Sequence, residues 1–546
     1  MKQRIKPLIM GLGLVGLVSS PAFAVDNNKL MLALQEQVSD LQEQINSLKS
    51  SKEHHKKKNE TARKRQHVGS YANAHRASGT PVTLNAAEVA AEKADQNPPK
   101  TGIYGPDDLP QTGLSYLPID LDVPGQSFVS TGPYLGVPLS YSGSNLIINT
   151  PSVNQDVALL KLRKNVDLRL QELGVSHPED HSHLLLSGNV EGQALYKNRG
   201  HGPDSSDIDV TNAELDAYIL GPSSWTSGYL ALNYENDIGS SSGAITTNSR
   251  SFNSRVFVNK AFITIGDFLK TNWYGTIGQM YVPFGTFGSS MVTGPMTRSL
   301  FRTKARAVLL GYQQQTPNAF YASGYVFKGD SYAASTSRIN NGGINLGVKY
   351  SIRAISGDIG GGFIRNVADS VGMQVAESKP FFDGFGSSST VCGLAGIMPC
   401  GSEKLVHDVP GYNARGTLSF GKWDLLAEYI TASTNFNPSN LSYNGNGAKP
   451  QALNAEAAYT FTFFEKPTSV ALGYGMTKDA LAIGLPEKRW VIVMNTSWWR
   501  NTLQSLEFRH DMNYAASSTA SGSMVASAPG TGASDNTVTA QFDIYF

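Results

Sequence analysis

The sequence predicts an all-β transmembrane barrel of 16 antiparallel strands, preceded by a periplasmic α-helical coiled-coil extension. Three observations support this prediction. Only 16% of the 546 residues are charged, whereas Gly (54), Tyr (23) and Phe (23) are abundant, which fits soluble helical enzymes poorly. After the N-terminus no apolar run reaches the roughly 18 residues of a spanning helix, so a membrane protein with this sequence must be a barrel. Beyond His183, apolar and polar residues alternate with period two, as in strands with one apolar face.

The net charge and the cysteine count exclude several classes of protein. Lys+Arg (45) and Asp+Glu (44) nearly cancel, so the net charge of +1 gives no reason to expect nucleic acid or an anionic membrane surface as partner. Only two cysteines occur, Cys392 and Cys400, which excludes both a disulfide-framework fold and a four-cysteine zinc site. In an oxidising compartment we expect these two to form a disulfide; the alternative is two unpaired thiols.

Residues 1–24 have the order of a secretory signal peptide. Three cations among the first six residues precede an apolar stretch from Leu8 to Val18, and small residues end at Ala24. The apolar stretch is too short for a permanent spanning helix. We therefore expect cleavage after Ala24 and a mature chain that starts at Val25 in an oxidising compartment.

Residues 25–50 are predicted to form a coiled coil. We expect residues 31–48 to assemble the protein into a homo-oligomer, and the sequence does not distinguish a dimer from a trimer. The alternative is a single amphipathic helix packed on another surface. Residues 51–151 are expected to be a linker, basic at first and then rich in Gly, Pro and Ser. The heptad positions of the coiled coil are Leu34, Val38, Leu41, Ile45 and Leu48.

Residues 152–182 are predicted to hold one amphipathic helix, either in the periplasm or as a plug-like element. Between Asp156 and Leu173 the apolar residues fall on one face, and Gly174 follows as a C-terminal stop.

Residues 183–546 are predicted to form the barrel. The connections between strands alternate short and long, as in an outer-membrane barrel with short periplasmic turns and long external loops. A soluble sandwich has no reason for this alternation. The expected strands are 184–196, 208–220, 227–237, 254–266, 272–283, 305–314, 318–328, 342–352, 357–366, 411–420, 422–432, 451–463, 467–477, 487–497, 501–512 and 536–546.

The sequence predicts no enzyme and no cofactor. No G-x-S-x-G, H-E-x-x-H or P-loop pattern falls on a fitting element. His177, His181 and His183, with Glu179 and Asp180, are chemically able to hold a divalent metal. Their spacing matches no standard site, and the alternative is a solvated turn.

A group of cations lies in the third long connection: Arg298, Arg302, Lys304 and Arg306 occur with no acid among them. If this connection folds into the lumen, it narrows the passage, and its guanidinium groups attract carboxylates or phosphates. The alternative is that the four cations decorate an external loop. Further cations expected to line the lumen are Lys260, Lys349, Arg353, Arg365 and Arg415, and the acids expected there are Glu191, Glu214, Asp216, Glu235, Glu428 and Glu456.

Four short motifs point to a known family: Gly132-Pro133-Tyr134, the stretch from Asn149 to Asp156, Gly278-Gln279 followed by Val282-Pro283-Phe284-Gly285, and Gly294-Pro295-Met296-Thr297. With the signal peptide and the coiled coil, they resemble the LbtU family of siderophore porins, the legiobactin receptor and its relatives. The resemblance covers nearly the whole mature chain.

This resemblance implies an outer-membrane receptor that takes up ferric polycarboxylate siderophores without a TonB-type plug domain. The implied partners are the ferric siderophore, outer-membrane lipid and the barrel insertion machinery. The Val-Pro-Phe-Gly element is also similar to phosphate-selective porins, so a general or anion/phosphate-selective porin stays as an alternative. A third alternative is a structural tether of the envelope, acting through the coiled coil and the linker.

Overall fold

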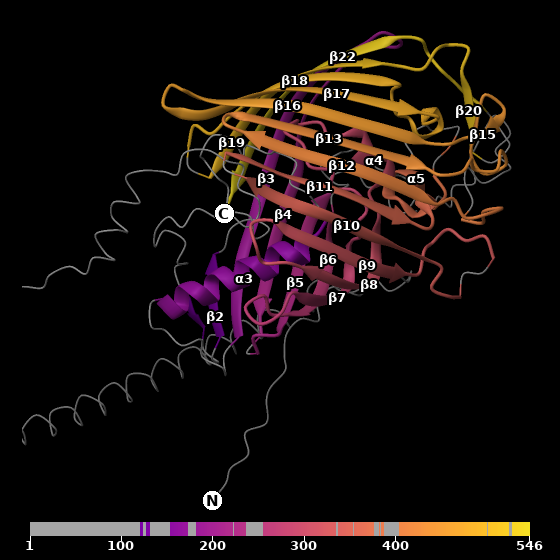
Figure 1. The fold of residues 1–546 in the computed structure, drawn as a ribbon. Helices are drawn as coiled ribbons and strands as arrows, with labels where there is room; N and C mark the ends of the chain where they lie inside the picture. Colours follow the sequence, from indigo (N-terminus) through magenta and orange to yellow (C-terminus); the bar gives the residue numbers. More distant parts are fainter. Residues whose placement is uncertain are drawn as a thin grey trace, which may run out of the picture. The chain divides into compact units, whose positions relative to one another are not determined.

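Sixteen antiparallel strands form a closed barrel in the part of the chain that the computed structural model describes (Figure 1). That part lies within one compact unit, Asn85–Phe546. The expected signal peptide, coiled coil and most of the linker lie outside it, as do Arg353, His177, His181 and the cysteine pair. The described residues are 121–123, 127–131, 153–172, 182–221, 223–235, 255–334, 337–352, 354–375, 382, 384–386, 403–499, 501–522 and 527–546.

The barrel strands follow one another around the wall in chain order. Closure is made by the last strand, which pairs with the first from Asp535↔Arg199 to Tyr545↔Asn189. The strands are β3 (Ser182–Arg199), β4 (Ser205–Leu220), β5 (Thr226–Glu235), β6 (Arg255–Gly266), β7 (Trp273–Tyr281), β8 (Lys304–Gln313), β9 (Ala319–Phe327), β10 (Asn341–Ile352), β11 (Ile355–Ile364), β12 (Gly411–Phe420), β13 (Trp423–Ala432), β16 (Gln451–Phe463), β17 (Lys466–Lys478), β18 (Lys488–Thr496), β19 (Thr502–Met512) and β22 (Ser534–Tyr545).

These strands confirm the predicted barrel, and every strand end lies within about three residues of its predicted place. The alternation of connections has one exception. The connection between β3 and β4 is short, residues 200–204, although it lies at the end of the barrel where the other connections are long. Both strands exceed their predicted lengths, with 18 and 16 residues. We call the two ends of the barrel the long-connection end and the short-turn end.

The two faces of the wall differ in polarity. On β22, Val538, Phe542 and Ile544 are 39–49% exposed on the outside. Their neighbours Thr539 and Asp543 are at most 5% exposed on the inside. A polar interior with an apolar outer face is stable where hydrocarbon covers the outside, as for a barrel in a bilayer.

A short hairpin extends the wall at the short-turn end. β1 (Leu121–Val123) pairs with β2 (Ser127–Thr131), and β2 pairs in parallel with Ser182 to Leu186 of β3. β22 reaches only to Asn189 on this edge, so β2 covers the part of β3 that β22 leaves unpaired. Among the described residues, no helix has the length and apolar character that crossing a membrane requires.

The long connections bury apolar side chains in a cluster that continues into the barrel through Phe284 and Leu300. Phe382, Phe385 and Phe436 are at most 2% exposed, and the rings of Phe385 and Phe436 stack with centroids 5.6 Å apart. This packing gives the long-connection end a folded cap. Its small elements are η5 (Val367–Asp369), α5 (Val371–Gln374), η6 (Leu481–Ile483) and a sheet of β14 (Ser442–Tyr443), β15 (Asn446–Gly447), β20 (Thr519–Ser521) and β21 (Ala528–Pro529).

Candidate functional site

The connection between β7 and β8 folds into the barrel. We call residues 282–303 the inward segment; it contains α4 (Met296–Phe301), which contacts β13, β16 and β17. Gly285 (φ 88°) and Phe287 (φ 60°) adopt left-handed conformations where the chain turns across the lumen. Phe284, Phe287 and Leu300 are at most 1% exposed, so the segment is packed like a core element.

Three glutamates of the wall hold the inward segment. We call Glu428 (β13), Glu456 (β16) and Glu507 (β19) the tether glutamates; each is at most 7% exposed. They accept hydrogen bonds from amides and hydroxyls of the segment, which satisfies buried backbone donors that would otherwise be unpaired. The contacts are Thr286 N–Glu428 (2.6 Å), Thr297 Oγ1–Glu428 (3.0 Å), Ser289 Oγ–Glu456 (2.6 Å), Ser290 N–Glu456 (2.9 Å), Thr293 N–Glu507 (3.0 Å) and Thr293 Oγ1–Glu507 (2.5 Å).

The cap holds α4 from the other side. The Ser370 hydroxyl donates to the Leu300 carbonyl (2.7 Å), and the Val371 amide donates to the Arg302 carbonyl (2.8 Å). A Cβ at Gly372 would lie 1.7 Å from the Ser299 carbonyl oxygen, so the approach of α5 to α4 requires glycine there. The inward segment is therefore fixed both to the far wall and to the cap.

Three of the four cations predicted for this connection, Arg298, Arg302 and Lys304, lie close enough to Tyr281 for their charges to act on it, whereas Arg306 points elsewhere. Arg298, on α4, lies close enough to Glu191 on the inner face of β3 for their charges to interact. The Arg302 guanidinium lies 4.3 Å from the ring centroid of Tyr281. Lys304 donates to the Asn259 side chain at 3.3 Å. Arg298 thus also reaches the inner face of β3, whereas Arg302 and Lys304 pack against residues of β6 and β7.

Arg306 faces away from the lumen, contrary to the expectation that it lines the constriction. It is exposed on the face of β8 that also carries Val308 and Leu310, which are 50% and 61% exposed. The reason is the period of the strand: residues two apart share a face, and that face of β8 is the outer one.

The other predicted cations are already engaged or lie elsewhere. Lys349 is on the inner face of β10, near the short-turn end. Lys260 pairs with Glu214 inside the barrel at 2.8 Å. Arg365 is exposed and pairs with Asp408 at 3.0 Å, so it does not line the lumen. Arg415 is buried on β12 and donates to the side chains of Asn413 (2.9 Å), Tyr321 (2.9 Å) and Asn345 (2.6 Å).

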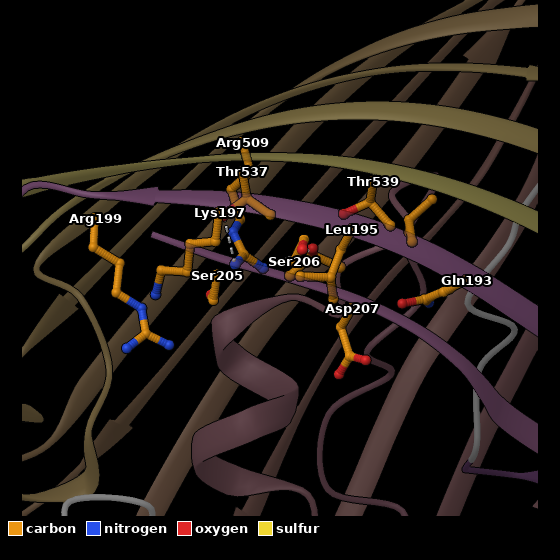
Figure 2. A pocket seen from close by; sticks show the side chains of 12 residues that line it. Gln193, Leu195, Lys197, Arg199, Ser205, Ser206, Asp207, Arg509, Thr537 and Thr539 are labelled. Carbon is orange, nitrogen blue, oxygen red and sulfur yellow. Dashed lines mark hydrogen bonds between the residues drawn. The ribbon is translucent and has the colours of Figure 1, made fainter. Parts of the chain in front are cut away.

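A cavity of about 400 Å³ lies between the inward segment and the wall. We call it the cation cavity because Lys197, Arg199 and Arg509 line it together with a single acid, Asp207. Figure 2 shows the three cations gathered on one side of the cavity and Asp207 with Gln193 on the other. The remaining lining residues are Leu195, Ser205, Ser206, Val292, Thr293, Thr537 and Thr539.

Sequence reasoning missed these cations. The first strand was expected to end at residue 196, which left Lys197 and Arg199 in a loop, whereas β3 continues to Arg199. The signal that could have found them is the alternation itself, because Gln193, Leu195, Lys197 and Arg199 share one face of an extended strand.

Inside the short-turn end lies α3 (Gln155–Glu172), which occupies almost the predicted helical residues. Residues 155–163 are buried except Ala158, so this half of the helix is surrounded on all sides and occupies part of the lumen. In Figure 1 α3 crosses the strands on the side of the barrel where β2 lies. Its contacts are Thr276 Oγ1–Asp156 (2.8 Å), Tyr218 hydroxyl–Leu159 O (2.9 Å), Arg163–Ser223 O (2.7 Å) and Arg163–Thr226 O (2.6 Å).

One carboxyl of the cap makes its packing pH-dependent. Burial raises the pKa of Asp369 to about 6, although its oxygens accept hydrogen bonds from the Ser331 amide and the Asn341 side chain, each at 2.7 Å. Because the folded pKa lies above the ordinary 3.8, this contribution to stability is full below about pH 4 and is lost as pH rises through 6, a difference of about 3 kcal/mol. We expect amide exchange at residues 329–331 to slow at pH 4 relative to pH 7, after correction for intrinsic rates. Asp369→Asn should abolish that difference; an unchanged difference in the variant would assign it to another group.

The histidine group is only partly described. His183 is a residue of β3, whereas His177 and His181 lie outside the described residues. Within the described part of the chain, no group of three or more His, Cys, Asp or Glu residues is placed to hold a metal ion.

Comparison with known proteins gives relatives along most of the chain. No family model matches the sequence. A UPF0422 protein of Coxiella burnetii is 38% identical over 425 residues, which cover 77% of this chain and 84% of the relative. A UPF0422 protein of Legionella pneumophila (strain Lens) is 36% identical over 465 residues, covering 82% and 83%.

Solved structures with a similar arrangement are more distant. An anion-selective porin from Comamonas acidovorans matches with a TM-score of 0.43 and 13% identity, over 67% of this chain and 100% of the other. The outer membrane channel DcaP of Acinetobacter baumannii matches with a TM-score of 0.41 and 13% identity, over 67% and 97%. It is the sequence identity to the Coxiella and Legionella proteins, over more than four-fifths of their lengths, that assigns this chain to the UPF0422 family.

Proposed function

We propose that the protein is an outer-membrane channel whose lumen favours anionic solutes, and that its substrate is a ferric siderophore bearing carboxylates. The observation that carries the proposal is the position of the cation cavity beside the inward segment. Lys197, Arg199 and Arg509 line this cavity with one acid, Asp207, among the lining residues. The apolar outer face of the barrel supports a location in a membrane.

The arrangement favours anions through a collective field. Charges in a cleft with low-dielectric walls focus the potential, which raises the local concentration of oppositely charged solutes. Guanidinium groups also hold carboxylates and phosphates through paired hydrogen bonds. Arg298 on α4 adds a cation on the side of the lumen facing β3. A carboxylate-bearing complex therefore meets cations both on the wall and on the inward segment.

The siderophore itself is supported by the sequence resemblance described above, and the geometry supports the broader class of anionic solutes. A channel of this kind passes its substrate without a globular plug domain. α3 then acts as a partial obstruction on the periplasmic side, since it lies at the short-turn end.

The test is uptake of a labelled ferric polycarboxylate siderophore by a strain deleted for this gene. We expect deletion to lower uptake and the full chain to restore it. Complementation with Arg199→Gln and Arg298→Gln combined should restore it poorly, by roughly tenfold or more, because charged clefts raise encounter rates by at least that order. Arg306→Gln is the matched control, since this exposed arginine lies on the outer face of β8. Uptake at the wild-type rate in the deletion strain would refute the siderophore assignment.

A further inference from the structure

We infer that the cation cavity is a saturable binding site for a solute that carries an oxyanion at one end and hydroxyl groups beside it. This inference rests on the proposed anion channel and adds the class of ligand that the channel binds. A general anion passage needs only a positive field. The cation cavity has, in addition, a volume of about 400 Å³, within the range of about 300–1,000 Å³ typical of small-molecule sites.

Arg509 is fixed in place with donors left over. Its two terminal nitrogens donate to the hydroxyls of Thr293 (2.9 Å) and Thr537 (3.2 Å), and its Nε lies 3.1 Å from Asp511. A guanidinium has five N–H donors, so one remains on each terminal nitrogen. Guanidinium donors of this kind bind the oxygens of a carboxylate or phosphate.

Lys197 and Arg199 extend the same end of the cavity. Lys197 Nζ lies 3.0 Å from Asp535, and an ammonium has three donors, so two remain for a ligand. Arg199 is exposed at the end of β3, one inward-facing position beyond Lys197. In Figure 2 Lys197 lies between Arg199 and Arg509 on this side of the cavity. Asp511 orients Arg509 and Asp535 orients Lys197, and an oxyanion would use the donors that remain on both.

The opposite end of the cavity suits hydroxyl groups. Asp207 offers acceptors and Gln193 an amide, while Ser205, Ser206 and Thr539 offer hydroxyls. Gln193 is oriented by its bond to Gln541 at 2.6 Å. A solute without a hydroxyl group would leave these acceptors and hydroxyls unmatched. A hydroxylated oxyanion, such as a hydroxycarboxylate or a phosphate ester, instead matches both ends.

The cavity lies between the inward segment, through Val292 and Thr293, and the wall of the barrel, so an occupant should impede ion flow. Thr293 lines the cavity, bonds Arg509 and is itself held by Glu507 at 2.5 Å. Binding therefore has an electrical readout in a planar bilayer: block of the chloride current by an added solute.

The experiment uses the full chain in planar bilayers in dilute KCl, with citrate, tricarballylate, inorganic phosphate and glucose added in turn. Tricarballylate is citrate without its hydroxyl. We expect citrate to block the current along a saturating curve, with a lower half-blocking concentration than tricarballylate, whereas glucose should not block. Inorganic phosphate is an oxyanion without the hydroxycarboxylate group, so it shows how much of the block an oxyanion produces by itself. We expect phosphate to block the current more weakly than citrate does.

Arg199→Gln is the informative variant because the exposed guanidinium carries none of the bonds that hold the inward segment. It should raise the half-blocking concentration of citrate about tenfold or more, as expected for loss of a charged hydrogen bond. Arg509→Lys keeps the charge, removes the paired donors and should weaken block as well. Citrate should block the Arg306→Gln variant at the same half-blocking concentration as the wild type.

If the current favours anions but citrate lowers it without saturation, or blocks the wild type and all three variants equally, the binding site is overturned and the channel proposal stands. Current that favours cations refutes the channel proposal itself.

Discussion

Replacing Glu428, Glu456 and Glu507 together by glutamine is expected to raise the single-channel conductance and its noise. Each carboxylate accepts at least two hydrogen bonds from the inward segment. Glutamine keeps one neutral acceptor but turns an N–H₂ group toward donors, so each site loses roughly 1.5–3 kcal/mol. The bonds between α4 and the cap remain, so the segment should move within the lumen without leaving it.

Glu465→Gln is the matched control for the tether glutamates. Glu465 is exposed in the short turn between β16 and β17, so the same chemical change there touches nothing in the lumen. The migration of heated and unheated samples in gels checks that the barrel forms. If the triple variant forms a barrel and conducts with the wild-type amplitude and noise, the glutamates do not set the aperture.

Loosening the packing of α3 inside the short-turn end is expected to have the second large effect, an increase in the conductance of the channel. Leu159 and Leu160 are 3% and 1% exposed, packed between the helix and the wall. Replacing both by alanine removes roughly 2–5 kcal/mol of packing for each residue. The remaining polar contacts are few, so a larger fraction of channels should have α3 displaced from the lumen.

Leu168→Ala serves as the control for α3 because Leu168 lies on the same helix and is 38% exposed. It should leave conductance and the melting of the barrel unchanged. Single-channel recording and thermal unfolding are measured on all three proteins. Should the double variant conduct as the wild type while its helix is shown by amide exchange to be loosened, α3 does not obstruct the passage.

The barrel was predictable because its signal is local and repeated. On β22, Val538 and Ile544 alternate with Thr537 and Asp543, and the bilayer requires that alternation on every strand. β3 and β4 were predicted too short because their outer ends carry polar residues such as Asn198 and Ser206. Beyond the apolar band, period two no longer separates hydrophobic from polar residues, so an assignment based on that difference in polarity places the end of the strand too early.

The site was less predictable because it depends on which parts of the chain meet across the lumen. Glu428 and Glu456 were expected to face inward, but nothing in the sequence pairs them with Thr286 or Ser290, more than 140 residues away. Arg306 was grouped with Arg298 by spacing alone, although one sits on a helix and the other on a strand. Side-chain direction follows the element, and the element boundary falls between them.

The central claim, that the lumen selects anions at the constriction, is tested most directly by the reversal potential across a planar bilayer. The full chain is placed between KCl solutions of different concentration, near 0.01 M and near 0.1 M, where the Debye length falls from about 30 Å to about 10 Å. We predict a reversal potential with the sign that indicates a preference for chloride. It should be largest for this dilute pair of solutions and smaller for a second pair in which both solutions are more concentrated. A reversal potential with the sign of potassium preference, or none at low salt, would contradict it.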